Sequence, residues 1–201
     1  MGKRVSPHLR FLLASGSPRR QQLLGEAGYE FEIAKAEVAE IFGDWLTIRE
    51  ATALNAMRKA MAVALNAPDV VVLGADTLVA LDGQVIGKPD DLAEAAKILR
   101  RLSGRSHEVW TSVFVCHQAS GRVDGFQEMS RVQFRRLDQR AIANYLAKVD
   151  PLDKAGAYAA QGHGTEIIEW IEGSYTNVVG LPMEETTRVL SDFGIEPGIV
   201  L

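Results

Sequence analysis

Residues 15–20 of the chain read SGSPRR and follow a short apolar run, so they place hydroxyl and guanidinium groups at the expected start of a helix. Ser17 is expected to cap that helix and the following proline to occupy its first turn, which leaves backbone N–H groups and a partial positive charge for an anion. Ser15 adds a hydroxyl, and Arg19 and Arg20 add planar donors that suit phosphate. In the alternative interpretation Ser17 only caps the helix and both arginines are solvated, so this segment alone does not decide for phosphate binding.

A second polar pair, Asp76 and Thr77, follows the strongly apolar residues 69–74, which predict a strand. Ligands in open α/β sheets gather at the carboxyl ends of strands, and we expect Asp76 to stand at such an end. Its carboxylate can bind a divalent cation or take a proton from a water that attacks phosphorus. The plainer interpretation is an aspartate in a turn.

Lys59, Lys88 and Gln161 contribute chemistry only if the fold brings them to the same cleft. Lys88 follows a predicted hairpin and contacts phosphate only if that hairpin folds back towards Asp76. Lys59 sits beside the apolar stripe of its predicted helix, and Gln161 carries an amide that can read the edge of a base. As isolated residues, all three are expected on the solvated surface. His107 has no second histidine or cysteine at metal-ligand spacing, so we expect a structural hydrogen bond there rather than zinc.

Strand patterns alternate with helix patterns along the chain, which predicts an α/β fold. The Asp-Gly pair at 82–83 is favoured in type I′ turns and predicts a hairpin of residues 78–81 and 84–86. The other strands are expected at residues 10–15, 108–117, 131–137 and 166–171, the middle two as another hairpin. Two hairpins within an α/β chain predict a mixed rather than a purely parallel sheet. We expect one domain over residues 1–201, with two lobes around a cleft.

Capping residues mark the expected starts of the helices. Thr47 and Glu50 form a capping box at the start of a long helix. The large apolar residues of this helix recur at three- and four-residue spacing and are expected to face the core; they are Leu54, Met57, Met61 and Leu65. Further helices are expected to start at Ser17, Asp91, Asp138 and Pro182.

Composition limits the classes of protein to which the chain can belong. Its 201 residues are 47% apolar and 24% charged, which allows a sizeable core. No apolar run approaches the ~20 residues that cross a bilayer, and the single cysteine, Cys116, fits a reducing compartment, so a cytoplasmic protein without a membrane partner is expected. A formal charge of -4 argues against a general nucleic-acid binder. The motifs of P-loop kinases, α/β-hydrolases and dinucleotide-binding proteins are absent from the sequence.

Five sequence blocks occur in order along nearly the whole chain: LASGSPRR, GADTLVALDGQVIGKP, LSGRSHEVWTSV, PLDKAGAYAAQG and GSYTNVVGLP. Together they resemble the Maf family of nucleotide pyrophosphatases. The resemblance implies an elongated, mixed and twisted sheet flanked by helices, similar to that of inosine triphosphate pyrophosphatases, with two lobes around a cleft and frequent homodimers. It also implies hydrolysis of a nucleoside triphosphate between the α- and β-phosphates.

The resemblance assigns the role of catalytic base to Asp76 and carries a family glutamate and lysine onto Glu40 and Lys59. A triphosphate has about four negative charges near neutral pH, so a divalent cation, Mg²⁺ or Mn²⁺, is expected between the phosphates and the carboxylates of Asp76 and Glu40. The side chains expected to contact substrate are Ser15, Arg19, Arg20, Lys59, Thr77, Lys88 and Gln161.

Substrate choice is tied in this resemblance to Arg19, Thr77 and Gln161. These residue types are those of the branch that is selective for dTTP and UTP, whereas the branch acting on 7-methyl-GTP tends to have SPW and a glutamine after the aspartate. A dTTP and UTP pyrophosphatase is therefore expected. The alternative is a nucleotide-binding regulator of cell division, because Maf proteins have also been linked to arrest of septum formation.

Overall fold

The computed structural model describes residues 11–43 and 45–198, and this part of the chain forms a seven-stranded sheet in the order β2-β1-β3-β5-β6-β7, with β4 paired to β3. Arg10, the first residue of a predicted strand, lies outside the described residues. The strands are β1 (Phe11–Leu13), β2 (Glu32–Ile33), β3 (Val71–Leu81), β4 (Gln84–Ile86), β5 (Ser106–His117), β6 (Arg122–Phe134) and β7 (Ile168–Glu172). The α-helices are α1 (Pro18–Glu26), α2 (Ile48–Ala64), α3 (Leu92–Leu102), α4 (Gln139–Leu146), α5 (Tyr175–Val179) and α6 (Met183–Asp192), and the short 3-10 turns are η1 (Gln118–Ser120), η2 (Ala155–Ala157) and η3 (Gly162–Glu166).

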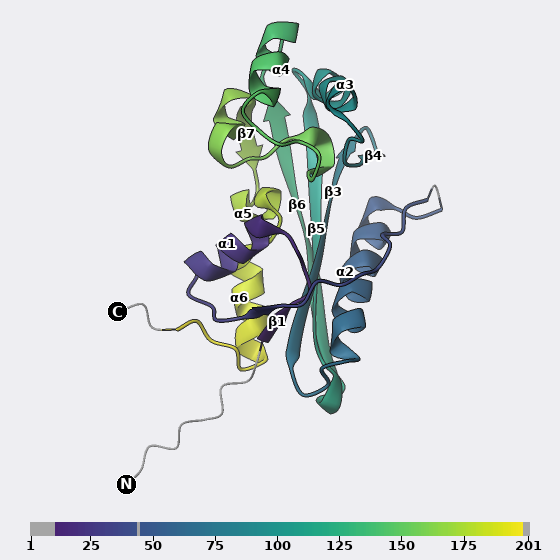
Figure 1. The fold of residues 1–201 in the computed structure, drawn as a ribbon, viewed down its shortest axis with the longest axis vertical. Helices are drawn as coiled ribbons and strands as arrows, with labels where there is room; N and C mark the ends of the chain where they lie inside the picture. The colour runs from purple at the N-terminus through teal and green to yellow at the C-terminus, as the bar shows by residue number, and fades with distance from the viewer. Residues whose placement is uncertain (1–10, 44, 199–201) are drawn as a thin grey trace.

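The sheet is mixed, as the two hairpins in the sequence predict. Strand β1 pairs in parallel with β2 and β3, whereas β3, β5, β6 and β7 form an antiparallel series. Strands β3, β5 and β6 have 11, 12 and 13 residues and give the molecule its elongated shape (Figure 1). The β3–β4 hairpin is confirmed, and Asp82 and Gly83 have the positive φ angles, 53° and 76°, that a type I′ turn requires.

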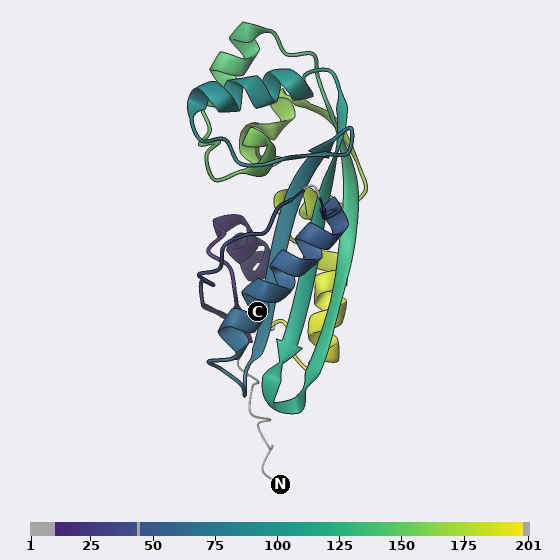
Figure 2. The ribbon, with the colours of Figure 1, turned by 90° about the vertical axis from the view of Figure 1, so that its right-hand side faces the viewer.

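Helices cover the long strands unevenly. Helix α2 lies along one face of β3 and β5, and α1, α5 and α6 lie on the opposite side (Figure 1). Helices α3 and α4 gather with η2 and η3 at one end of the sheet, apart from α1 and α2 (Figure 2). The capping box of Thr47 and Glu50 is confirmed at the start of α2, and Asp91 and Asp138 cap α3 and α4 through their side chains.

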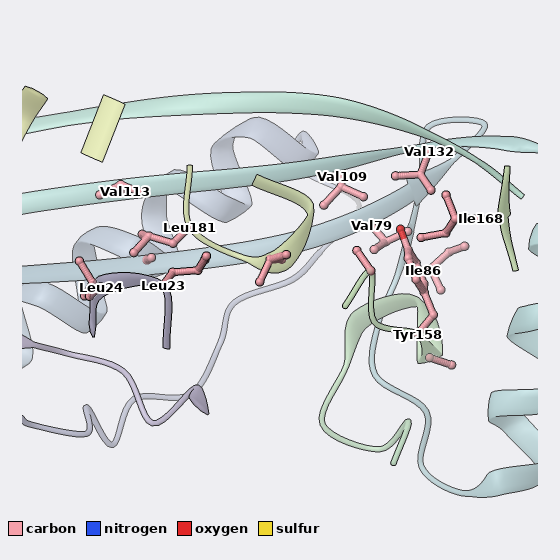
Figure 3. Packing of buried hydrophobic residues seen from close by; sticks show 14 of the residues in the cluster. Leu23, Leu24, Val79, Ile86, Val109, Val113, Val132, Tyr158, Ile168 and Leu181 are labelled. Carbon is pink, nitrogen blue, oxygen red and sulfur yellow. The ribbon is translucent and has the colours of Figure 1, made fainter. Parts of the chain in front are cut away.

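One apolar cluster runs along the sheet face opposite α2. Alternate residues of each strand point to this face, as the two-residue period of a strand requires. Figure 3 shows Leu23, Leu24 and Leu181 near Val113, whereas Tyr158 lies further along the strands beside Val79, Val109 and Ile168. The same core therefore anchors both α1 and the segments at the far end of the sheet.

The buried face of α2 differs from the predicted one. Met57 and Leu65 of the predicted apolar stripe are 38% and 65% exposed, and the helix instead buries small or polar residues. These are Ala51, Thr52, Asn55, Ala56, Ala60 and Ala64. Small residues face the sheet because α2 packs directly on β3 at Gly74, where an added Cβ would lie 2.4 Å from the carbonyl oxygen of Ala56.

Several strand boundaries also differ from the predicted ones; β1, for example, ends at Leu13 instead of residue 15. Strand β3 continues through Asp76, which was expected at a strand end, because β5 pairs with it from residue 71 to residue 80. Strand β6 starts at Arg122 rather than near residue 131, since pairing with β5 extends over polar residues that carry no apolar alternation. Helix α5 lies in a polar segment between Gly173 and Gly180, and the side chain of Ser174 caps it by accepting a hydrogen bond from the N–H of Asn177.

Candidate active site

A cleft of about 960 Å³ opens beside residues 76–79 of β3. This volume lies within the range typical of small-molecule sites. The cleft is lined from one side by the loop after β1, by α1 and by the segment after β2, and from the other side by residues 87–88 and 153–160. The predicted site residues that line it are Ser15, Arg19, Arg20, Glu40, Lys59, Asp76, Thr77 and Lys88.

Asp76 lies on β3 where one edge of that strand has no paired neighbour among the described residues. The parallel neighbour β1 ends after Leu13, which pairs with Leu73, and the ladder to β4 starts only at Val79. The backbone between these two ladders borders the cleft instead of another strand. Because side chains alternate along a strand, Asp76 faces α2 and Thr77 faces α1.

The ammonium group of Lys59 bridges the carboxylates of Asp76 and Glu40. Its Nζ lies 2.6 Å from Oδ1 of Asp76 and 2.7 Å from Oε1 of Glu40, and Nζ of Lys88 lies 3.9 Å from the same Glu40 oxygen. Burial raises the pKa of Glu40, but the hydrogen bond and charge of Lys59 outweigh burial and hold this pKa below its usual value. The site therefore places two carboxylate groups around one lysine.

Two side chains of α2 hold the backbone on either side of Glu40. The amide of Asn55 accepts a hydrogen bond from the N–H of Ile41 at 2.8 Å and donates one to its carbonyl at 3.2 Å. The same amide donates to Oδ2 of Asp76 at 3.3 Å, and Arg58 donates to the carbonyl of Ala39. Sequence reasoning missed Asn55, although a polar residue four positions before Lys59, on the same helix face, was a usable signal.

Arg20 is buried and holds protein groups, whereas the sequence predicted a substrate contact. Its guanidinium donates to the carbonyl of Gly180 at 2.8 Å, to Oγ of Ser15 at 3.1 Å and to Oγ1 of Thr77 at 3.0 Å. The predicted cap of α1 also differs, because Ser17 makes no side-chain capping bond and its N–H donates to Oγ of Ser15. Arg20 thus ties the loop after β1 to β3 and to the end of α5.

The three residues that the family resemblance ties to substrate choice differ in their position relative to the cleft. Arg19 borders the cleft and pairs with Asp153 at 3.1 Å across it. The hydroxyl of Thr77 lies 2.9 Å from that of Thr111 in addition to its bond from Arg20. Gln161 is half-buried and does not line the cleft, although the two residues before it do.

His107 makes the structural hydrogen bond that its sequence context predicts. Its Nε2 lies 2.8 Å from the hydroxyl of Tyr158, and burial lowers the pKa of the imidazole to about 4. The ring packs edge-on against Phe134 and Tyr158. His107 therefore fixes the cleft-lining Tyr158 from behind and stays neutral near pH 7.

The carboxylates of Asp76 and Glu40 fit the expected divalent cation. Among the described residues there is no group of three or more histidine, cysteine or acidic side chains that suits a metal. Mg²⁺, however, is commonly bound by one or two carboxylates together with substrate phosphates and water. The Lys59 ammonium between the two carboxylates shows that their oxygens already converge on a positive charge.

These features define a mixed α/β protein with an acidic and lysine-containing site at an open sheet edge. The chain belongs to the Maf family: a family model described as "Maf-like protein" matches residues 10–193. The chain is 46% identical to a "dTTP/UTP pyrophosphatase" of Pelotomaculum thermopropionicum over 183 aligned residues. These aligned residues cover 91% of this chain and 96% of the relative. It is 43% identical to a "dTTP/UTP pyrophosphatase" of Bacillus thuringiensis subsp. konkukian over 187 aligned residues, and these cover 93% of this chain and 97% of that relative.

A solved structure of a HAM1 protein from Coxiella burnetii is similar to this chain with a TM-score of 0.42 and 18% identity, over 65% of this chain and 75% of that one. None of the helices in the described ranges is both long and apolar enough to span a membrane.

Proposed function

We propose that this protein is a nucleoside triphosphate pyrophosphatase that hydrolyses dTTP and UTP to the monophosphate and pyrophosphate. The observation that carries the proposal is the cluster of the buried Asp76 with the half-buried Lys59 and Glu40 at the open edge of β3. The cleft beside it also presents Arg19, Lys88 and the N-terminus of α1, which suit a polyanion. The two relatives named above carry the same activity in their names.

In the proposed mechanism Asp76 orients and deprotonates the water that attacks the α-phosphorus. Nζ of Lys59 contacts Oδ1 of Asp76 and holds this carboxylate in place beside the cleft. Glu40 holds Lys59 from the other side. A bound Mg²⁺ or Mn²⁺, held by Asp76 and Glu40, would supply further positive charge to the phosphates.

The leaving pyrophosphate gains negative charge as the bond to the α-phosphorus breaks. Arg19 and Lys88 line the cleft on either side of Asp76, so we assign them to this charge. Arg20 acts through Ser15 and Thr77, which it holds in place, and is a positioning residue in this proposal. Thr77, Arg19 and Gln161 remain our candidates for substrate choice.

We further propose that residues 1–201 act as one domain with two lobes, that the protein is cytoplasmic and that it forms a homodimer. Its partner molecule in the cleft is a nucleoside triphosphate, with no nucleic acid or membrane involved. The net charge of -4 leaves the cations of the cleft as the local attraction for phosphate.

The test measures pyrophosphate release from dTTP, UTP, CTP, ATP, GTP and 7-methyl-GTP, with Mg²⁺ and with a chelator. We expect dTTP and UTP to be hydrolysed fastest and all release to stop without the metal. Binding of these nucleotides without release of pyrophosphate from any of them would refute the enzyme and favour the regulator of cell division.

A further inference from the structure

Tyr145 of α4 holds one peptide segment of the cleft wall by both of its polar backbone groups. Its side chain is 1% exposed, and its hydroxyl accepts a hydrogen bond from the N–H of Ala159 at 3.1 Å. The same hydroxyl donates to the carbonyl oxygen of Ala159 at 3.5 Å. Both backbone groups of Ala159 therefore point to the Tyr145 side of the segment.

Planar trans peptides fix the direction of the two neighbouring groups. The described chain has no cis peptide bond, and in a trans peptide the C=O and the N–H point in opposite directions. The carbonyl of Tyr158 and the N–H of Ala160 must therefore point away from Tyr145. Within the described part of the chain, neither group makes a backbone or side-chain hydrogen bond.

The residues that carry these two groups line the cleft. Tyr158, Ala159 and Ala160 all line it, and the apolar side chains of Val79 and Val109 line the same end. The segment is held rigidly, because His107 binds the hydroxyl of Tyr158 from behind. A flat apolar ligand with a polar edge would fit such a wall.

The order of the two groups matches the edge of a uracil or thymine base. Both bases present an N3–H donor beside carbonyl acceptors on their pairing edge, and protein groups can hydrogen-bond that edge. The carbonyl of Tyr158 can accept from N3–H while the N–H of Ala160 donates to an adjacent carbonyl oxygen of the base. Main-chain groups would thus read the base without help from the Gln161 amide.

We propose that the carbonyl of Tyr158 and the N–H of Ala160 bind the pairing edge of the pyrimidine, and that Tyr145 is the positioning residue that aims them. This inference rests on the proposed function, because it takes the substrate to be a uracil or thymine nucleotide. It adds a recognition element that lies in the backbone and is therefore independent of the residue types in the segment itself.

The experiment compares UTP with 3-methyl-UTP, which lacks the N3–H donor, on the wild-type protein and on Tyr145→Phe. Affinities are measured by calorimetry with Ca²⁺ in place of Mg²⁺. Loss of one hydrogen bond that leaves a protein acceptor unpaired predicts roughly 10- to 100-fold weaker binding of 3-methyl-UTP to the wild type. In Tyr145→Phe the penalty should shrink several-fold, because the carbonyl is no longer aimed at N3.

Two further variants distinguish recognition of the base from a nonspecific loss of binding. Tyr175→Phe removes an exposed phenol and should keep the wild-type ratio of the two affinities. In Gln161→Ala, loss of the discrimination against 3-methyl-UTP would assign N3 to the glutamine and overturn the inference, whereas retained discrimination would support it. A purely structural role of Tyr145 would weaken both ligands equally and leave the ratio unchanged, which likewise overturns it.

Equal binding of UTP and 3-methyl-UTP by the wild type would refute the inference directly. If the wild type still hydrolyses UTP in that case, the proposed function stands and only the base contact is wrong. If no pyrimidine triphosphate is bound or hydrolysed, both proposals fail together.

Discussion

Nζ of Lys59 lies 2.6 Å from Oδ1 of Asp76, and the two residues come from helix α2, which packs directly on β3, and from β3 itself. The contact is possible because Ala56 and Ala60 let α2 approach the sheet at Gly74, two residues before Asp76. A lysine on a helix held further from the sheet would not reach the carboxylate of Asp76. Close backbone packing thus sets the charge around the proposed base.

Asp76→Asn is expected to lower turnover of dTTP by about 10²- to 10⁴-fold, since the amide keeps the size of the side chain but cannot take a proton. The fold should persist, as judged by circular dichroism and urea denaturation. Asp82→Asn, in the exposed turn of the β3–β4 hairpin, is the matched control and should keep wild-type turnover. Near-normal turnover in Asp76→Asn would remove this residue from the central role.

Asn55→Leu is expected to lower both turnover and stability. The substitution keeps most of the volume but leaves the buried amide partners at Ile41 unpaired, which costs about 1–3 kcal/mol of unfolding free energy. Because the Glu40 segment is released, more Mn²⁺ should be needed for half-maximal activity. Asn66→Ala, at the exposed end of the same helix, is the comparison. An unchanged Mn²⁺ requirement would show that Asn55 does not position Glu40.

Arg20→Lys is expected to reduce the free energy of unfolding by about 2–5 kcal/mol, because a lysine cannot make the three directed bonds of the guanidinium. Arg19→Lys disturbs only a partly exposed ion pair with Asp153, which is worth at most about 1 kcal/mol. Urea denaturation of both variants gives the comparison. Equal stability of the two would contradict the structural role of Arg20.

His107 predicts a loss of stability in mild acid. Burial lowers its pKa from 6.5 to about 4, so below pH 6.5 the unfolded chain takes up a proton that the folded protein refuses. This contribution is fully present above pH 6.5 and is lost as pH falls towards 4, by roughly 3 kcal/mol in total.

The measurement is urea denaturation at pH 7.5, 6.0 and 5.0 for the wild type and for His107→Gln. The variant starts less stable, since it disturbs the contact with Tyr158, but it should lose less stability between pH 7.5 and pH 5.0. His163→Gln, at an exposed histidine, should follow the wild-type curve. Parallel curves for the wild type and His107→Gln would refute this source of pH dependence.

Local signals predicted the parts of the fold that local chemistry determines. The capping box at Thr47 and the Asp-Gly turn after β3 depend on neighbouring residues only, and both are present. The buried face of α2 depends instead on how closely the helix approaches the sheet. The sequence pattern favoured large apolar residues such as Leu65, but the close approach at Gly74 selects alanines.

The sequence predicted which residues belong to the candidate site better than it predicted the contacts between them. Eight of its predicted residues line one cleft, and six of them, all except Glu40 and Lys59, stand in the sequence blocks that carry the family resemblance. The position of Asn55 on the helix face of Lys59 was a usable signal, but its hydrogen bonds to Ile41 and the burial of Arg20 were not predictable, since they depend on distant backbone groups at Ile41 and Gly180. Periodicity carries no information about such long-range contacts.

Asp76 and Thr77 are adjacent in the chain, yet the sheet itself stands between their side chains. One side holds Lys59 and Glu40, and the other holds Arg20 and Thr111. A substitution around Thr77 can therefore reshape one compartment while the charged groups around Asp76 keep their spacing. Under the proposed function, nucleotide preference could therefore change on one side of β3 in the course of evolution while the groups assigned to hydrolysis on the other side stay as they are.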